Sequence, residues 1–286
     1  MDRLTRIAAA AILALGLALI GGCTMMRLGY GHLDTFAMSM ADEYFELDPA
    51  QKHEFSTRFD RLHEWHRREQ LPNYAAFLRE ATARLQKGPT REDVAWMLDG
   101  LDERYRAIAR RGTDDAVALL VTVTPAQLET LQRRWERDNA KFAREHRLNR
   151  GVDEQRSERA KRTIKQIEEW VGDLTDEQEQ KIIAISNRPP SIERARQEER
   201  LRRQREFLKL MELRGNREAF AKQLGHWLLN WEEGRTPEQV KLFREAREKR
   251  IEIYVTAASM LTPAQRTHLT SRAQGYMGDF ARLAER

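Results

Sequence analysis

The sequence has little of what usually builds sheets or crosslinks. Its 286 residues include one cysteine, Cys23, so no disulfide can form within the chain. Glycine and proline are few, with 15 and 8 residues, and runs of β-branched residues are short. Glycine and proline mark turns, and β-branched residues favour strands. The scarcity of all three therefore favours a fold of long helices that side-chain packing must stabilise.

The sequence also lacks a membrane-spanning run and a dominant sign of charge. The longest apolar segment, Ile7–Ile20, is shorter than the roughly 20 residues that a spanning helix needs. Charged residues make up 33% of the chain with a formal net charge of +5, and both signs are interleaved. This pattern predicts a solvated surface rather than a nucleic-acid interface, and the sequence contains no nucleic-acid motif.

The first 23 residues have the layout of a secretory signal. A basic start, Met1–Arg6, precedes the apolar segment, which ends in Leu19-Ile20-Gly21-Gly22-Cys23. Small residues before a cysteine resemble the lipobox of bacterial lipoproteins. The resemblance implies removal of residues 1–22, a diacylglycerol on the Cys23 thiol and an acylated (for example palmitoylated) new N-terminus. The absence of Asp after Cys23 favours the outer membrane, facing the periplasm. The alternative is an ordinary buried cysteine.

Apolar residues after position 30 recur at helical spacing. The clearest sets are Leu33, Phe36, Ala37, Met40, Tyr44 and Phe45; Phe55, Phe59, Leu62 and His66; Leu128, Leu131, Trp135 and Phe142; and Ile164, Ile167 and Val171. We therefore predict an all-α fold, a multi-helix bundle or array that follows a cleaved signal peptide.

A short motif recurs five times along the chain. Its copies are Leu47-Asp48-Pro49-Ala50-Gln51, Val123-Thr124-Pro125-Ala126-Gln127, Leu174-Thr175-Asp176-Glu177-Gln178, Arg235-Thr236-Pro237-Glu238-Gln239 and Leu261-Thr262-Pro263-Ala264-Gln265. Thr or Asp can cap a helix, Pro suits the first helical position, and Gln three residues after the cap can complete a capping box. Each copy therefore predicts a helix start.

The order of these starts suggests an internal duplication. Gly88-Pro89-Thr90 and Gly234-Arg235-Thr236 each open a predicted helix that leads to a later motif copy. We expect a tether at residues 23–31, an N-terminal helical half at 32–150 and a C-terminal half at 151–286. The alternative is that capping boxes recur independently in any helical protein.

Two resemblances follow from these motifs. The capping motif resembles the LTxxQ motif of the periplasmic Spy and CpxP proteins, a chaperone and a stress-signalling modulator. The mature chain also resembles an uncharacterised family of Gram-negative lipoproteins of unknown function. The residues that carry this second resemblance are Arg27–Tyr30, Asp42–Leu47, Gln51, Trp65–Tyr74, Asp138-Asn139, Trp170 with Leu174-Thr175, and Arg200–Met211. It implies a helical, lipid-anchored envelope protein and brings no catalytic residues.

A search for catalytic or metal chemistry finds no motif. In His63-Glu64-Trp65-His66 the histidines are three apart, whereas a zinc protease helix needs them four apart. The sequence has no G-x-S-x-G elbow and no phosphate-binding glycine loop. We therefore expect no catalytic residue, no metal site and no cofactor, with an envelope enzyme or peptidoglycan-acting factor as the alternative.

The segment Trp65–Tyr74 is the candidate partner-binding site, with Trp65, His66, Arg67 and Tyr74 as its candidate residues. These residue types are favoured at protein interfaces. The alternative is a structural elbow in which the aromatic residues pack inward and Pro72 opens the next helix. A second polar stretch, Ser191–Arg205, predicts a long solvated helix, with a basic binding surface as its alternative.

Together these patterns predict a lipid-anchored, periplasm-facing protein with an interaction or chaperone-like role. Its expected partners are the membrane, through the lipid at Cys23, and other envelope proteins. The sequence indicates no particular oligomeric state.

Overall fold

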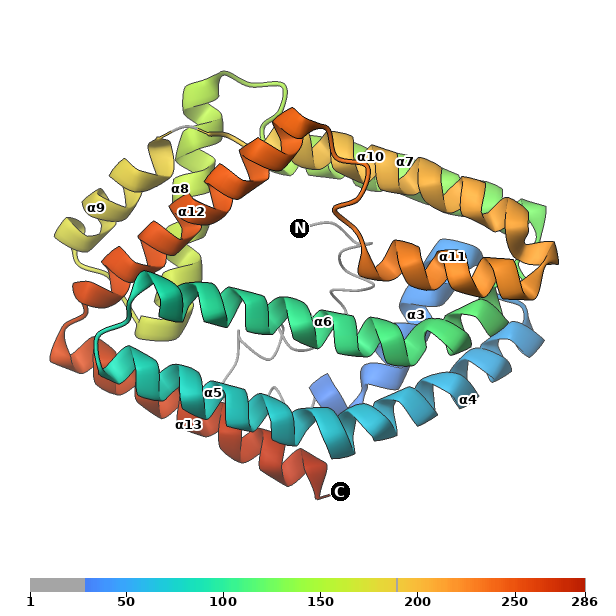
Figure 1. Ribbon diagram of the computed structural model, residues 1–286, viewed down its shortest axis with the longest axis horizontal. Helices are drawn as coiled ribbons and strands as arrows, with labels where there is room; N and C mark the ends of the chain where they lie inside the picture. The colour runs from blue at the N-terminus through green and yellow to red at the C-terminus, as the bar shows by residue number, and fades with distance from the viewer. Residues whose placement is uncertain (1–28, 189, 286) are drawn as a thin grey trace. The chain divides into compact units, whose positions relative to one another are not determined.

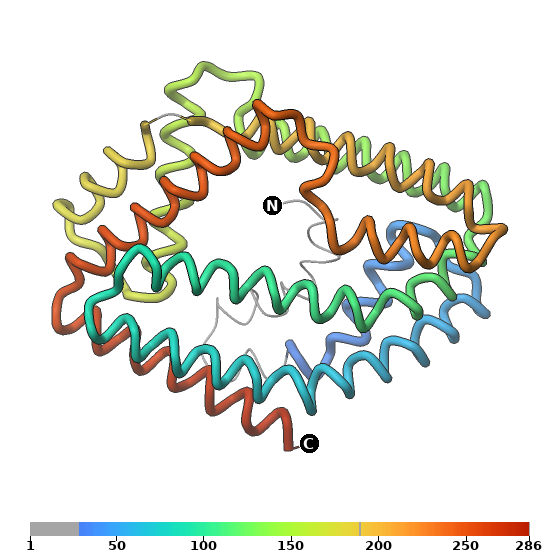
Figure 2. Tube along the Cα trace, viewed as in Figure 1, coloured from blue at the N-terminus to red at the C-terminus, as the bar shows by residue number. Residues whose placement is uncertain are grey.

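The computed structural model describes residues 29–188 and 190–285, and over these ranges the chain is helical without a strand (Figures 1 and 2). This confirms the predicted all-α class. The predicted signal peptide and Cys23 lie outside the described residues. Among the helices that the structure describes, none is long and apolar enough to cross a membrane. The α-helices are α3 (Leu33–Phe45), α4 (Pro49–Trp65), α5 (Leu71–Gln86), α6 (Arg91–Leu120), α7 (Pro125–Glu145), α8 (Val152–Val171), α9 (Asp176–Asn187), α10 (Glu193–Met211), α11 (Arg217–Leu229), α12 (Pro237–Ser259) and α13 (Pro263–Ala284).

All five copies of the capping motif begin a helix, as predicted. They precede α4, α7, α9, α12 and α13. In the last copy, Thr262 Oγ1 accepts a hydrogen bond from the Gln265 N–H over 3.2 Å. Gln265 Oε1 accepts one from the Thr262 N–H over 3.0 Å, which completes the capping box. The helix boundaries therefore follow from local residue chemistry.

The chain forms two compact units. Unit 1 comprises residues 29–70, Asp102–Phe142 and Gln197–Gly234. Its buried core contains Tyr44, Val117, Val123, Leu131, Trp135, Phe207, Leu210, Met211, Phe220 and Leu224. In this unit α7 and α10 lie side by side (Figure 2), and the rings of Trp135 and Phe207 meet edge to face with centroids 5.8 Å apart. Such aromatic contacts add packing energy to apolar burial.

Unit 2 comprises Leu71–Leu101, Ala143–Arg196 and Arg235–Arg286. Helix α5 runs along α13 (Figure 1), and α9 packs on α8 and α12. One apolar cluster contains Ile167, Val171, Ile182, Ile253, Ala257 and Leu261. A smaller cluster contains Val94, Leu98 and Ile251. Each unit contains residues from both of the sequence halves predicted at 32–150 and 151–286. The halves are therefore not the same as the units, and their origin by duplication stays a prediction.

The two glycine-led helix starts have the same local geometry. Gly88 and Gly234 have φ angles of 86° and 81°, which glycine adopts without a steric penalty. Thr90 then shares reciprocal hydrogen bonds with Asp93, just as Thr236 does with Gln239. The matching turns are consistent with the predicted repetition.

Candidate functional site

Two motif glutamines meet in unit 1 and join two helix starts. Gln51 Nε2 donates to Gln127 Oε1 over 3.1 Å, and Gln127 Nε2 donates to Gln51 Oε1 over 2.6 Å. The two Nε2 atoms also donate to the carbonyls of Thr122 and Glu46, in the turns that precede the opposite helix. Because each Oε1 also accepts from its own cap residue, all four hydrogen-bonding positions of each amide are filled.

Unit 2 repeats this arrangement with the other pair of glutamines. Gln178 and Gln265 exchange hydrogen bonds of 2.8 and 2.9 Å. Their amides also donate to the carbonyls of Met260 and Asp173, both over 2.8 Å. All four paired glutamines are buried. Fully satisfied buried polar networks rigidify a fold. The paired motif copies therefore start two helices and also join the turns that precede them by hydrogen bonds.

The sequence carried a signal for this pairing that local reasoning missed. A capping box needs only an acceptor at its last position, which Glu supplies as well as Gln. The motif uses Gln in all five copies, and the amide N–H₂ then remains for a distant partner. In four copies that partner is the glutamine of another copy.

The predicted partner segment begins with a π-helical turn, η1 (His66–Gln70), that follows α4 directly. Trp65 is half-buried and its Nε1 donates to Glu69 over 2.8 Å. His66 is buried, and its Nδ1 pairs with Tyr30 Oη at 2.8 Å. The Arg67 guanidinium pairs with Glu64. The structure therefore places these three candidate residues together in unit 1.

Tyr74, the fourth candidate, belongs to unit 2. It is 3% exposed and its ring meets Phe280 of α13 edge to face at 6.1 Å. Pro72 lies at the second position of α5. Burial of Tyr74 and His66 matches the elbow alternative for these two residues. Trp65 is only half-buried, so its role as a partner contact stays a prediction.

The buried environment of His66 disfavours its charged form. Burial lowers its pKa to about 4, and the neighbouring His63 acts in the same direction. The imidazole is therefore neutral near pH 7, and one ring nitrogen can pair with the Tyr30 hydroxyl. Burial also lowers the pKa of His63.

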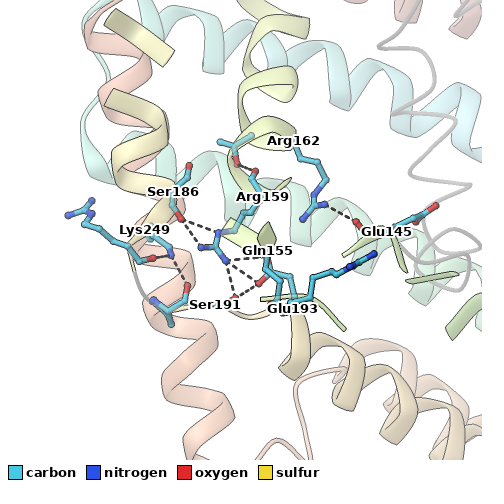
Figure 3. A network of polar contacts seen from close by, with 12 residues as sticks. Glu145, Gln155, Arg159, Arg162, Ser186, Ser191, Glu193 and Lys249 are labelled. Carbon is cyan, nitrogen blue, oxygen red and sulfur yellow. Dashed lines mark hydrogen bonds and ion pairs between the residues drawn. The ribbon is translucent and has the colours of Figure 1, made fainter. Parts of the chain in front are cut away.

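A second group of polar residues gathers in unit 2 around Arg159 of α8 (Figure 3). The Arg159 guanidinium donates to the Ser186 carbonyl over 2.9 Å and to Ser191 Oγ over 3.0 Å. It also pairs with Glu193 at 3.2 Å. Burial alone would raise the pKa of Glu193, but the hydrogen bond from Ser191 and the charge of Arg159 bring it below its usual range. Glu193 is thus an ionised, paired carboxylate that joins the start of α10 to α8.

The interpretation of Ser191–Arg205 as a solvated helix is wrong for one face of α10. Glu193, Arg200 and Gln204 are 3%, 7% and 6% exposed. In unit 1, Gln204 exchanges hydrogen bonds of 2.9 and 3.2 Å with Asn139 of α7, whose Oδ1 also accepts from Arg200. Burial lowers the pKa of Arg200 to about 10. Charged composition alone could not show this, because the partners come from other helices.

Lys249 of α12 borders an open groove in unit 2. Its Nζ donates to the Pro190 carbonyl over 2.6 Å and to that of Arg188. Burial, and then the charge of Arg159, lowers its pKa to about 8. The groove measures about 450 Å³. Its lining residues are Arg188, Pro190, Arg244, Glu245, Glu248, Lys249 and Glu252.

This lining balances three basic side chains with three acidic ones. Arg188 and Glu252 pair at 2.6 Å, and Glu248 pairs with Arg91. A shallow surface with alternating charges can bind a polar segment that carries both signs. Within the described residues, no group of three or more His, Cys, Asp or Glu side chains is placed to hold a metal ion.

The chain belongs to a family of unknown function, DUF6279, whose model matches residues 43–240. The matched range includes Trp65–Tyr74, Arg159 with Glu193, and three of the four paired glutamines, whereas Tyr30 and the α12 residues that line the groove lie outside it. No curated protein and no solved structure matches the chain.

Proposed function

We propose that this protein is a lipid-anchored helical component of the Gram-negative envelope that faces the periplasm and acts by binding other envelope proteins. The anchor is proposed from Gly21-Gly22-Cys23 behind a short apolar segment. One acyl chain holds a protein weakly, whereas the three chains of a mature lipoprotein hold it firmly. Thr24, in place of Asp, favours the outer membrane. The LTxxQ resemblance to Spy and CpxP supports a chaperone-like role.

The mixed-charge groove of unit 2 is the observation that carries the binding role. It is open, and Lys249 joins two other lining residues by donating to the carbonyls of Arg188 and Pro190. Charged rims select partners by complementary potential and limit non-specific adhesion. An extended polypeptide segment with both charges fits such a surface better than a small apolar ligand, which needs an enclosed pocket.

Site-specific photocrosslinking in intact cells tests this role. A photoreactive residue replaces Arg244, in the groove, or Arg250, an exposed residue that helical spacing places on the opposite face of α12. We expect a defined adduct from position 244 and none from position 250. The adduct partner should also bind the purified chain, and charge reversal by Lys249→Glu should weaken that binding. Equal adducts from both positions, or binding that ignores Lys249→Glu, would contradict the proposal.

An envelope enzyme or peptidoglycan-acting factor is the second candidate. It is favoured by one observation: a lysine with a lowered pKa beside three carboxylates in a groove. Purified protein incubated with peptidoglycan should then release soluble fragments, and Lys249→Met should abolish the release. If the wild-type chain releases none, this alternative is discarded while the binding role still stands.

The paired glutamines also support the proposed internal duplication. Each predicted half contains one complete pair, Gln51 with Gln127 and Gln178 with Gln265. In both pairs the amides reach the carbonyl two residues before the opposite cap. Duplication of an ancestral helical unit that contained one glutamine pair would give this arrangement. Substitution in the full chain tests it, because both units combine residues of the two halves. Gln51→Met and Gln178→Met should lower the free energy of unfolding by similar amounts, and a loss confined to one pair would contradict equivalent copies.

A further inference from the structure

Tyr30 is buried in unit 1 at the start of the described chain. It is 4% exposed and lies in the helical turn at residues 29–31 that precedes α3. Its ring centroid lies 4.6 Å from that of His63 and 5.9 Å from that of His66. Its hydroxyl pairs with His66 Nδ1 at 2.8 Å. A tyrosine buried with both its ring and its hydroxyl engaged is firmly seated.

The surface against which Tyr30 packs is formed by His63 and His66, and their spacing in the sequence suits this contact. Residues three apart share a face of a helix, so His63 and His66 point together toward Tyr30. The ring of His63 also lies 5.8 Å from that of Phe59, one turn earlier in α4. The histidine spacing that does not fit a zinc helix thus fits a seat for one aromatic ring.

The place of Tyr30 in the sequence gives this contact a consequence. Tyr30 is seven residues after Cys23, and a fully extended chain spans at most about 3.6 Å per residue, so the two residues can be at most about 25 Å apart. The next element is α3, which begins at Leu33, ten residues after Cys23, with a limit of about 36 Å. The seat on α4 therefore sets how much chain can act as a tether.

We propose that Tyr30, seated on His63 and His66, is a clamp that ends the membrane tether and holds unit 1 close to the lipid surface. This inference rests on the proposed lipid anchor at Cys23. With the clamp closed, the C-terminal part of α4 stays within reach of the lipid headgroups. With the clamp open, the tether gains the residues up to the start of α3, which packs on α4, and unit 1 moves over a larger volume.

Proteolytic release from vesicles tests the clamp directly. Full-length lipidated protein is bound to phospholipid vesicles and treated briefly with trypsin, which cleaves after Arg27, three residues before Tyr30. Cleavage follows the population of the open state when opening is fast. Tyr30→Ala loses the ring contacts and the hydrogen bond to His66, and it should release the protein body about tenfold faster than wild type. Tyr30→Phe keeps the ring contact and should lie between the two.

Tyr105→Ala is the matched control, because Tyr105 is another tyrosine of unit 1 whose hydroxyl is bonded, here to the Leu228 carbonyl over 3.1 Å. It should release the body at the wild-type rate, measured at a temperature where thermal melts show every variant folded. Equal release rates for wild type and folded Tyr30→Ala would overturn the clamp.

Distance to the membrane provides a second readout. Thr57, an exposed residue of α4, is replaced by Cys and labelled, and energy transfer to an acceptor dye in the vesicle headgroups is measured. Tyr30→Ala should lower the transfer efficiency, whereas Tyr105→Ala should not. Unchanged transfer in Tyr30→Ala would also overturn the clamp.

Failure of the lipid anchor gives a different result. In that case the wild-type chain does not bind vesicles at all. The contact of Tyr30 with His63 and His66 is then tested on the protein in solution, by measuring the rate of cleavage after Arg27 with mass spectrometry. If Tyr30→Ala leaves this rate unchanged, the contact does not restrain the chain, whether or not the protein is lipidated.

Discussion

Breaking one glutamine pair should cost far more stability than breaking a capping box alone. Gln178→Met preserves volume but removes the hydrogen bonds to the Thr175 N–H, the Met260 carbonyl and the Gln265 amide. Each bond contributes about 1 kcal/mol net, and each buried group left without a partner costs about 1–3 kcal/mol. We expect a loss of about 3–5 kcal/mol in the free energy of unfolding.

The double variant separates pairing from capping. In each single variant one amide stays buried without its partner, so Gln178→Met with Gln265→Met should lose less than the sum of the two. The coupling free energy should be about 1–3 kcal/mol, as for residues in one hydrogen-bond network. Denaturant unfolding followed by circular dichroism measures all four species of the cycle.

Gln239→Met is the matched control, because the capping box of Gln239 lies at an exposed position. It should cost about 1 kcal/mol or less. Additivity of Gln178→Met and Gln265→Met within about 0.5 kcal/mol, the margin expected for independent sites, would show that the two amides are not coupled. A control variant that loses as much stability as Gln178→Met would show that the pair adds nothing to capping.

Three further outcomes follow. Burial lowers the pKa of folded His66 to about 4, so the free energy of unfolding should fall by about 3 kcal/mol as the pH drops from 6.5 to 4. Denaturant unfolding at several pH values should show a smaller fall in His66→Asn. Thr262→Ala should cost about 1 kcal/mol while partner binding survives where the variant is folded; a wild-type melting temperature with lost binding would contradict the cap. Glu193→Gln should weaken the Arg159 contact and lower the melting temperature; an unchanged melt would contradict a structural role.

The helix starts could be predicted from the sequence because their causes are local. Thr or Asp, Pro and Gln lie within a few residues of each other, and each satisfies a need of the first helical turn. The same reasoning could not predict that Gln51 meets Gln127. Those residues are 76 positions apart, and their approach depends on the packing of whole helices.

The candidate site shows the same limit. Trp65, His66 and Tyr74 are close in sequence, yet Tyr74 packs in unit 2 while the other two belong to unit 1. His66 looked like an interface residue, but its ring nitrogen is taken by Tyr30, 36 positions away. Glu193 and Arg200 looked solvated because neighbouring charges suggested an exposed helix. Their burial depends on Arg159 and Asn139, which no local pattern connects to them.

Fatty-acid labelling of Cys23 tests the central claim, anchoring of this helical protein in the envelope, most directly. Cells that express the full chain are grown with labelled palmitate, and their inner and outer membranes are separated. The wild-type chain should carry the label and sediment with the outer membrane. Cys23→Ser should lose both the label and the membrane association while its circular dichroism stays helical. Equal labelling of wild type and Cys23→Ser, or a wild-type chain that carries no label and washes free of membranes, would contradict the account.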